Sequence, residues 1–557
     1  MKRMLALAVA GALLSACASI PSTGPIVQGP RVDVLRNDGY VRVLARPPVA
    51  GMSPEAVVRG FLVASASIPD GDDTARTYLT SAASRAWNAQ SSITVYDAAA
   101  LTVTVEGDDR VRIAAPKIGT IDGRNRYITA NAGAQFEDVL QLRQVDGEWR
   151  IDSAPKALYL GEGDVRRSYR PYPVYFFDPA FTALVPEFVL LPIGSGGPAT
   201  QLMRSLLAGP SSEFDSALVS AIPRGTTLGF RTVSISGTTA SVPLDRVALA
   251  VPADRREALL AQIVWTLSTL PQVVLVRVTV DGEVLTTGAG TGSYTAADFT
   301  KVDPEDAADV ANLVFVQGDQ AFELRDSQRR QIPSAAPASA LALSRSGGLA
   351  AFVTQDRKIV FVTQNGSSPR PIAVGRDLAR PQILADGRLW FVDREAQGGL
   401  RAWDPEAGVQ RVTTGLADGA RILDYAIAPD RSRIAVVVNN GVTTTLRIGV
   451  ISRTQSGYRI VGLARVEQKL SAVSTVTWEN MQELVVIGSI GAVAVQPIRL
   501  SLPTGELTLL GGPANAVTIT ASIGQPIIVG DEAGQLWEYR DGRWNASELG
   551  SAPNYVL

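Results

Sequence analysis

Few residues of this chain are equipped for chemistry. Its 557 residues include one cysteine, Cys17, and no histidine. The missing histidine excludes Ser-His-Asp triads, histidine-ligated zinc sites and imidazole proton shuttles, and a lone cysteine excludes an internal disulfide and a thiolate metal cluster. Carboxylate pairs, or a Ser–Lys dyad drawn from six lysines, remain. We therefore expect no enzyme, no catalytic residue, no metal site and no cofactor, with a carboxylate-pair hydrolase as the remaining enzymatic alternative.

Cys17 stands at the end of a short export signal. A positive pair, Lys2-Arg3, precedes the apolar run Leu5–Leu14, and Ser15–Cys17 supplies small side chains for a signal peptidase. The run is shorter than the ~20 residues that a membrane-spanning helix needs. The motif resembles a bacterial lipobox, which implies removal of residues 1–16, S-diacylglycerol and an N-acyl chain on Cys17, and anchoring at the extracytoplasmic face of the cell membrane. The alternative is an ordinary signal peptide with an incidental cysteine.

Charge and length limit the partners and the number of domains. Charged residues make up 19% of the chain and the formal net charge is -2, so there is no electrostatic footprint for nucleic acid. About 540 residues remain after the signal, which is enough for roughly three domains of ordinary size. Residues 17–51 are rich in Pro, Gly, Ser and Arg without periodicity, and we interpret them as a tether. Its arginines either contact anionic headgroups or lie in solvent.

Two further motifs are better explained by local structure than by chemistry. Asp386, Asp393 and Asp430 lie near the ends of predicted strands. A glycosidase needs two carboxylates about 5 to 10 Å apart, but turns at strand ends also favour aspartate, so we expect turn roles for all three. The glycine loop Gly194–Gly197 lacks the lysine and hydroxyl of a phosphate-binding loop, and we interpret it as a helix-start turn.

Residues 52–165 predict an α+β domain. Ser53-Pro54-Glu55 is a helix start, with a hydroxyl N-cap and proline at the first helical position. After Trp87 the apolar period changes from helical to alternating, and Asp146-Gly147 predicts a tight hairpin turn. Helices followed by an antiparallel sheet of this kind resemble the NTF2-like cone fold. We expect Trp87 and Trp149 to fill its core rather than to line a pocket.

Residues 172–290 predict a second α+β domain. The pattern predicts helices at Pro198–Leu207 and Arg255–Leu267, a buried strand at Val273–Val280, and a hairpin of Leu228–Ile235 with Thr239–Leu244. The stretches Leu206–Pro210, Ala221–Thr226 and Gln262–Leu267 look like motifs of a GerM-type domain. That resemblance implies a protein of the cell envelope or of sporulation, and it carries over no catalytic residue.

After a linker at residues 291–308, residues 309–557 contain a degenerate repeat that predicts a β-propeller. Strand cores recur at Leu313–Val316, Leu349–Val353, Leu389–Val392, Ile434–Val438, Leu484–Ile487 and Ile527–Val529. Neighbouring cores lie roughly 40 to 50 residues apart, the length of one four-stranded blade, so we expect six blades. The first copy lacks an opening strand, and we expect Asn554–Leu557 to supply it and to close the ring.

The lipobox, the cone, the GerM-type domain and the propeller occur in an order that resembles the LpqB lipoproteins of actinobacteria. The resemblance implies an accessory protein that binds the extracellular domain of a sensor histidine kinase of the MtrB type. Such a protein would modulate a two-component system that controls cell-wall metabolism, division or sporulation. The alternative from the residues is a protein that binds a cell-wall glycan or lipid ligand. The sequence does not indicate which surface makes contact.

Overall fold

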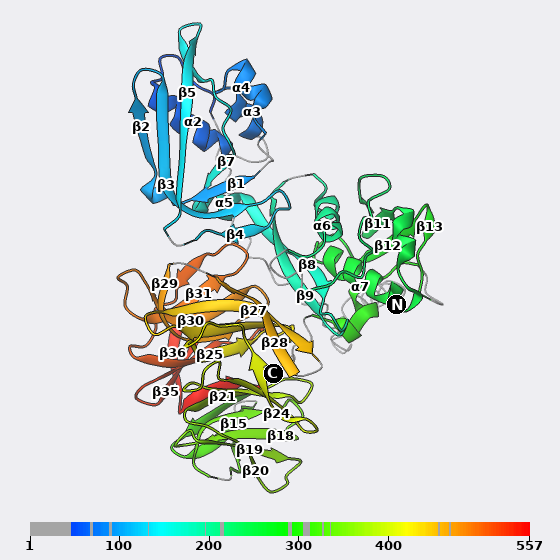
Figure 1. Ribbon diagram of the computed structural model, residues 1–557, viewed down its shortest axis with the longest axis vertical. Coiled ribbons are helices and arrows are strands. Elements are labelled where there is room, and N and C mark those ends of the chain that lie inside the picture. The colour runs from blue at the N-terminus through cyan, green and yellow to red at the C-terminus, as the bar shows by residue number, and fades with distance from the viewer. Residues whose placement is uncertain are drawn as a thin grey trace, which may run out of the picture. The chain divides into compact units, whose positions relative to one another are not determined.

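A computed structural model describes residues 46–66, 71–88, 92–131, 133–194, 196–211, 217–287, 292–304, 312–325, 328–334, 336–454, 457–466 and 469–556. The predicted signal peptide, Cys17 and most of the predicted tether lie outside the described residues. The chain from Arg42 onward is one compact unit. It has the fold class expected from the sequence, with two α+β domains followed by an all-β propeller (Figure 1). Among the described residues, no helix is long and apolar enough to cross a membrane.

The N-terminal domain packs short helices against one mixed sheet. Its helices are α2 (Pro54–Ser65), α3 (Gly71–Arg76), α4 (Ser81–Ala86), α5 (Glu162–Ser168) and the 3₁₀ turn η1 (Ala98–Ala100), and its strands are β1 (Ile93–Tyr96), β2 (Thr102–Glu106), β3 (Arg110–Ile121), β4 (Tyr127–Thr129), β5 (Gln135–Val145), β6 (Glu148–Ile151) and β7 (Leu158–Gly161). The strand order is β6-β5-β3-β1-β7, with β2 and β4 paired to β3. The strand pairs are antiparallel as expected except one, because β7 returns to the sheet parallel to β1.

Local sequence signals set the helix and the turn that frame this sheet. Ser53 caps α2 by accepting a hydrogen bond from the Ala56 amide, and the helix buries the apolar side of its first three turns against the sheet. Asp146 and Gly147 both have positive φ, 52° and 81°, as a tight hairpin turn of the predicted type requires. Trp87 is buried and its ring lies edge-on to that of Phe61 at 5.3 Å, so it fills the core as expected.

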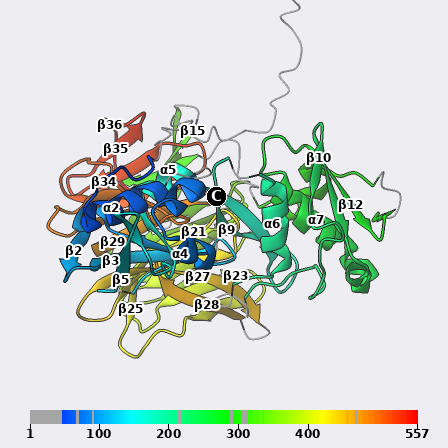
Figure 2. The ribbon, with the colours of Figure 1, turned by 90° about the horizontal axis from the view of Figure 1, so that it is seen from above.

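The middle domain has two small sheets and two longer helices, of which α6 is amphipathic and α7 is buried along most of its length. Its helices are α6 (Pro198–Leu207), α7 (Arg256–Leu267) and the 3₁₀ segments η2 (Arg246–Ala250), η3 (Ala253–Arg255) and η4 (Ala296–Val302), and its strands are β8 (Tyr169–Phe177), β9 (Leu184–Pro192), β10 (Ser234–Ser236), β11 (Thr239–Leu244), β12 (Leu275–Val280) and β13 (Glu283–Val284). Strands β8 and β9 pair with each other, and β10 to β13 form a second sheet in chain order. Helix α7 packs against β12 of this second sheet, whereas α6 packs against α7 and against β8 and β9 (Figure 2).

The predicted strand Leu228–Ile235 is wrong over most of its length. The described backbone is in strand conformation only from Ser234. Leu228 forms a single bridge with Leu244 of β11. Arg231 then has a positive φ of 58° and the Phe230 side chain is 79% exposed, so the chain turns through solvent between this bridge and Ser234. The alternation of apolar residues in this stretch led to the wrong strand prediction.

Buried polar side chains explain one of the motifs in this domain. Gln262 on α7 is fully buried, and its Oε1 accepts a hydrogen bond from the Ala221 amide at 2.8 Å. Thr266, one turn later, accepts from the Tyr175 amide at 3.2 Å and donates to the Gln262 carbonyl. These contacts attach α7 to a loop and to β8, so the motif residues hold elements together.

The C-terminal strands form six blades within the described residues. Blade 1 contains β14 (Leu313–Gln317), β15 (Gln320–Arg325) and β16 (Gln328–Ile332), and blade 2 contains β17 (Ala338–Leu343), β18 (Leu349–Thr354), β19 (Ile359–Gln364) and β20 (Arg370–Val374). Blade 3 contains β21 (Leu378–Ile383), β22 (Leu389–Asp393), β23 (Leu400–Asp404) and β24 (Gly408–Thr413), and blade 4 contains β25 (Arg421–Ile427), β26 (Arg433–Asn439), β27 (Thr444–Thr454) and β28 (Gly457–Arg465). Blade 5 contains β29 (Leu470–Trp478), β30 (Glu483–Ile490), β31 (Gln496–Ser501) and β32 (Leu507–Leu509), and blade 6 contains β33 (Ala516–Thr520), β34 (Ile527–Asp531), β35 (Gln535–Arg540) and β36 (Arg543–Leu549). Each predicted strand core is the second strand of its blade, counted from the centre.

The last strand closes the ring, as expected. β37 (Ser551–Tyr555) pairs antiparallel with β14 and becomes the innermost strand of blade 1. It follows β36 of blade 6 directly in the chain, so blade 1 contains strands from both ends of the propeller. Closure of this kind pairs sheet edges that would otherwise stay open.

Deleting residues 554–557 should destabilise the propeller, because it removes the part of β37 that pairs with Leu313 and Val314. We expect the melting temperature of the propeller to fall by about 5 °C or more, since 2 kcal/mol in a domain of this size corresponds to roughly 4–8 °C. Differential scanning calorimetry of the full chain measures it. Ser551→Ala is the control, because it changes an exposed side chain and keeps the strand. An unchanged melt after the deletion would contradict a stabilising role for closure.

Candidate functional site

The three acidic residues considered for catalysis all serve turns. Asp386 accepts hydrogen bonds from the amide and the guanidinium of Arg388. Asp393 accepts from backbone amides on both of its oxygens. Asp430 caps its turn and forms a buried ion pair with Arg433, with 2.6 Å between Oδ2 and Nε. Each carboxylate accepts hydrogen bonds from residues of its own turn or of an adjacent loop, in agreement with the turn roles predicted from the sequence.

The structure also shows the role of the glycine loop that precedes α6. Gly197 is the N-cap of α6 with a left-handed backbone (φ 72°), and Pro198 begins the helix, so the glycine loop is a helix-start turn. Ser195 of that loop and the lipidation candidate Cys17 lie outside the described residues. Within the part of the chain that the structure describes, no cluster of acidic side chains is arranged to hold a metal ion.

A ring of backbone bulges surrounds the propeller channel. All six innermost strands have a register shift near their first residues, at Ala338/Ala340, Ala379/Gln382, Ile422/Asp424, Ser471/Thr475 and Ala516/Thr518, and on β37 opposite Val314/Val316. Three bulged residues have positive φ without being glycine: Arg380 (45°), Ala472 (48°) and Ala552 (47°). Such backbone is costly and is kept where the surroundings enforce it, often beside functional sites, where a bulge re-aims side chains.

Arg380 of blade 3 spans the channel and contacts three other blades. Its Nη1 donates to Asp424 of blade 4 and to Thr475 Oγ1 of blade 5, the latter at 2.9 Å. Its Nη2 donates to the Ile519 carbonyl of blade 6 at 3.1 Å. The same Asp424 oxygen, Oδ2, also accepts from the Thr475 hydroxyl and from the Val476 amide. One guanidinium thus joins four consecutive blades.

Asn554 completes the connection. Its side-chain amide donates to the Leu341 carbonyl of blade 2 at 3.2 Å and to the Pro381 carbonyl of blade 3 at 3.1 Å. Tyr425 donates to the Arg380 carbonyl at 2.9 Å, and burial raises the pKa of this hydroxyl well above its ordinary value, so it stays a donor. Through Asn554 and Arg380, all six blades are linked by side chains in the channel. The sequence signal for this network was weak: one arginine within the strand Leu378–Ile383.

A cavity of about 110 Å³ lies beside this network. Residues of all six innermost strands line it, together with Arg357 and Arg394 from loops of blades 2 and 3. Arg394 Nε donates to the Leu423 carbonyl at 2.7 Å, directly before Asp424 in the chain. Sequence analysis did not identify this cavity, because its residues come from strands far apart in the chain.

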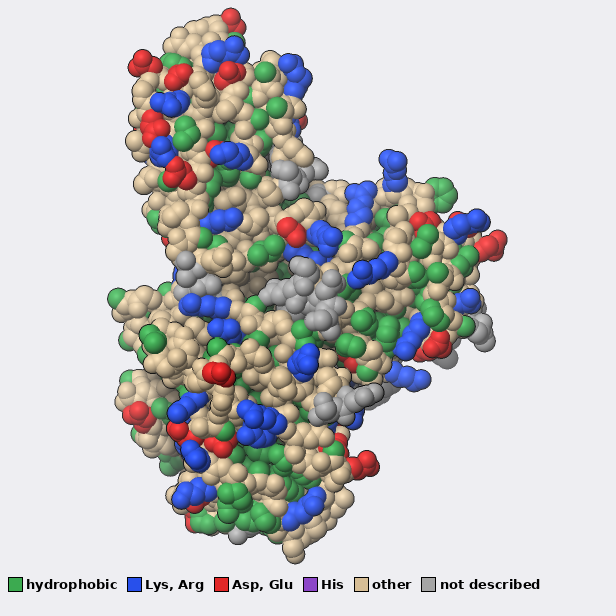
Figure 3. Space-filling model, in the orientation of Figure 1, with side chains coloured by type: hydrophobic (Ala, Val, Ile, Leu, Met, Phe, Trp, Pro, Cys, Tyr) green, Lys and Arg blue, Asp and Glu red, His purple; other side chains and the backbone are tan. Residues whose placement is uncertain are grey.

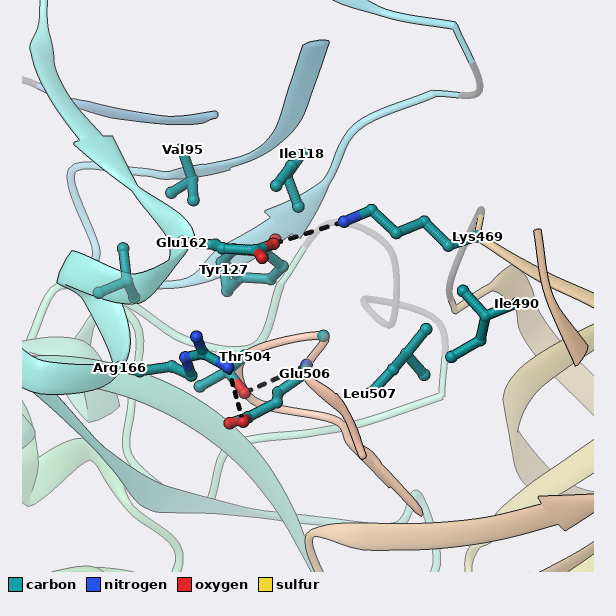
Figure 4. Close-up of a pocket in the computed structure, with 12 residues that line it drawn as sticks. Val95, Ile118, Tyr127, Glu162, Arg166, Lys469, Ile490, Thr504, Glu506 and Leu507 are labelled. Carbon is teal, nitrogen blue, oxygen red and sulfur yellow. Dashed lines mark hydrogen bonds and ion pairs between the residues drawn. The ribbon is translucent and has the colours of Figure 1, made fainter. Parts of the chain in front are cut away.

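A second cavity, of about 180 Å³, lies where the N-terminal domain faces blade 5 (Figure 4). Its apolar lining comes from both sides: Val95, Ile118, Tyr127 and Val165 of the N-terminal domain, and Ile490 and Leu507 of blade 5. Pockets with mostly apolar walls and a few polar groups suit small organic ligands. We call this cavity the interdomain cleft.

Two ion pairs cross the interdomain cleft. Helix α5 carries Glu162 and Arg166 one turn apart, and the Glu162 carboxylate lies 3.4 Å from Lys469 Nζ while Arg166 Nη1 lies 2.8 Å from the Glu506 carboxylate. Figure 4 shows both pairs at the edge of the apolar walls. All four side chains are more than a third exposed, so each pair contributes at most about 1 kcal/mol. These ion pairs therefore contribute little to holding the two sides of the interdomain cleft together.

The surface carries no large region of one sign on the face seen in Figure 3. Basic and acidic side chains are interspersed there. This distribution agrees with the formal net charge of -2.

Three family models match the chain. They are described as Lipoprotein LpqB, N-terminal domain (residues 47–166), Sporulation and spore germination (residues 173–286) and Lipoprotein LpqB beta-propeller domain (residues 312–555).

Curated relatives match over nearly the same span. Lipoprotein LpqB of Streptomyces coelicolor is 30% identical, over 87% of this chain and 86% of that protein. Lipoprotein LpqB of Cutibacterium acnes is 28% identical, over 97% of both chains. Among solved structures, TolB from Acinetobacter baumannii aligns with 55% of this chain and 86% of that chain, at 13% identity and a TM-score of 0.36.

Replacing Arg380 by methionine should leave the buried Asp424 carboxylate without its cationic partner. We expect Arg380→Met to lower the free energy of unfolding of the propeller by about 3–5 kcal/mol, because a buried charge then stays uncompensated. Adding Asp424→Leu should restore part of the loss. Urea denaturation of the full chain measures both, with Arg376→Met, an exposed arginine nearby, as control. A double variant no more stable than Arg380→Met would contradict the pairing.

Replacing Asp430 distinguishes a structural role of this carboxylate from a catalytic one. Asp430→Asn should destabilise the propeller by about 3 kcal/mol, because Arg433 is buried beside it. The exposed turn residue Asp541 provides the control Asp541→Asn. Thermal melts and a glycan-hydrolysis assay measure the two properties. Full stability combined with lost hydrolysis would instead support a carboxylate enzyme.

Proposed function

Because the chain belongs to the LpqB lipoprotein family, we propose that it is a lipid-anchored accessory protein that acts by binding. The anchor is Cys17, carrying S-diacylglycerol and an N-acyl chain after removal of residues 1–16. The proposed location is the extracytoplasmic face of the cell membrane. In this proposal the chain is divided into a tether at 17–51, an NTF2-like domain at 52–165, a GerM-type domain at 172–290, a linker at 291–308 and a propeller at 309–557.

The single observation that carries a binding role is the complete absence of histidine together with the use of the only cysteine in the lipobox. The structure adds that the candidate acids are engaged in turns. Histidine is thus missing and the three candidate acids are occupied, whereas a closed propeller presents rigid loops for recognition. A non-catalytic protein is the simplest function that fits.

The proposed partner is the extracellular domain of a sensor histidine kinase of the MtrB type. The resemblance to LpqB lipoproteins supports this choice. Anchoring two proteins in one membrane raises the effective concentration of each for the other, so a weak contact is sufficient. By this contact the lipoprotein would modulate control of cell-wall metabolism, division or sporulation.

Ligand binding is the second candidate function, and the interdomain cleft favours it. Six apolar side chains line its walls, and its two crossing ion pairs are weak. A lipid or glycan fragment of the cell wall would then bind in the interdomain cleft.

The test of the first function is affinity purification from native membranes after mild crosslinking. The full chain and Cys17→Ala are compared, and partners are identified by mass spectrometry. We expect a sensor histidine kinase with the full chain and at least about tenfold less with Cys17→Ala, because the effective concentration is lost. As control, Cys17→Ala fused to an unrelated transmembrane anchor should restore recovery. Equal recovery of kinase with and without an anchor, or no kinase at all, would contradict the proposal.

A further inference from the structure

A loop of the middle domain, residues 227–233, holds an aromatic side chain out in solvent. Phe230 is 79% exposed, and it is the only exposed aromatic residue in the part of the chain that the structure describes. Single exposed aliphatic side chains are common on protein surfaces, whereas aromatic rings are usually at least partly covered, because burying a ring removes a large apolar area from water. We call residues 227–233 the Phe230 loop.

Backbone hydrogen bonds fix the Phe230 loop at both of its ends. The Gly229 amide donates to the Pro243 carbonyl at 2.9 Å. At the other end, the amide of the buried residue Val233 donates to Thr200 Oγ1 at 2.9 Å. The exposed position of the ring is therefore set by the fold of the loop.

The neighbouring segment η2 adds two exposed aliphatic side chains. The Asp245 carboxylate holds the two segments together, because Oδ2 accepts from the Thr227 amide at 3.0 Å and Oδ1 accepts from the Val247 amide at 3.1 Å. Val247 and Leu249 of η2 are both exposed. We call Phe230, Val247 and Leu249 together the Phe230 patch.

Three exposed arginines accompany the Phe230 patch. Arg231 follows the aromatic residue directly and has the positive φ of 58°, which is strained backbone for a residue with a side chain. Arg204 of α6 reaches the loop, because its Nη2 donates to the Arg231 carbonyl at 3.1 Å. Arg246, at the start of η2, lies 3.2 Å from the Asp281 carboxylate. Even with Asp245 and Asp281 included, these side chains carry a positive charge in sum.

We propose that the Phe230 patch inserts into the surface of an anionic lipid bilayer and so gives the middle domain a membrane contact of its own. The aromatic ring and the two aliphatic side chains lie among the lipid headgroups, and the three arginines contact the lipid phosphates. A stable protein interface buries about 800 Å² on each partner. Three apolar side chains among arginines make a smaller surface, whose charge and shape fit a lipid headgroup layer.

The length of chain before the first described residue agrees with this contact. About 30 residues separate Cys17 from Arg46, and a chain of that length spans up to ~100 Å when extended. The bilayer that holds the anchor is therefore within reach of the Phe230 loop, an argument that rests on the proposed lipidation of Cys17. A weak second contact is then sufficient, because the anchor keeps the loop close to the membrane.

Vesicle flotation of the chain from residue 17 onward, carrying Cys17→Ala, tests the proposal without any lipid anchor. Its result is therefore independent of whether Cys17 is lipidated. The probes are vesicles of phosphatidylcholine, with and without an equal amount of phosphatidylglycerol. We expect at least about tenfold tighter binding to the anionic vesicles, because each arginine near an anionic surface strengthens binding severalfold. No binding to anionic vesicles at about 5 mM lipid would overturn the proposal.

Two variants in the Cys17→Ala background assign the binding to the patch. Phe230→Ser should weaken binding to anionic vesicles about tenfold, because the ring no longer leaves water. It should keep the melting temperature, since the ring is exposed in the folded chain. Arg231→Gln should weaken binding to anionic vesicles severalfold and leave binding to neutral vesicles unchanged. Val374→Ser, which alters an equally exposed apolar side chain of the propeller, is the matched control and should bind as the parent does.

A protein partner at the same patch gives a different result. In that case Phe230→Ser in the anchored chain would lose a crosslinked membrane protein, while vesicle binding of the Cys17→Ala form stayed at the level of its parent. Unchanged vesicle binding by Phe230→Ser, with or without such a loss, would overturn the lipid contact.

Discussion

The propeller depends on a polar contact at its centre as well as on apolar packing. The Arg380 guanidinium reaches blades 4, 5 and 6, and Asn554 reaches blades 2 and 3. A buried ion pair adds little net stability compared with apolar residues of the same size, but losing one partner is costly. This network therefore connects the blades around the channel and makes them sensitive to the loss of either partner. A chain with no possible internal disulfide gains a fixed ring from it.

Features encoded by neighbouring residues were predictable from the sequence. The N-cap Ser53, the turn at Asp146-Gly147 and the repeated strand cores of the propeller each need only a short window to be recognised. The error at Leu228–Ile235 has the same origin, because apolar alternation in a short window does not show where a turn interrupts the strand. The short strands β1 and β7 were not assigned, and their parallel pairing is an exception in the expected antiparallel sheet.

The two cavities could not be predicted, because their walls come from residues far apart in the chain. Arg380 and its acceptor Ile519 are 139 residues apart, and Glu506 is 340 residues from Arg166. No spacing rule connects such residues. The sequence was sufficient for two simpler conclusions. Histidine is absent from the whole chain, and the aspartates at strand ends were correctly expected to serve turns.

Every proposed role assumes that the domains act from a membrane surface, and Cys17 carries that assumption. The most direct measurement is mass spectrometry of the amino-terminal peptide of the protein extracted from its native membranes. We expect the mature chain to begin at Cys17 and to carry a diacylglycerol on sulfur and an acyl chain on nitrogen. A peptide that still contains Ala16 joined to Cys17, or a Cys17 with a free thiol, would contradict the anchored location and the binding role that follows from it.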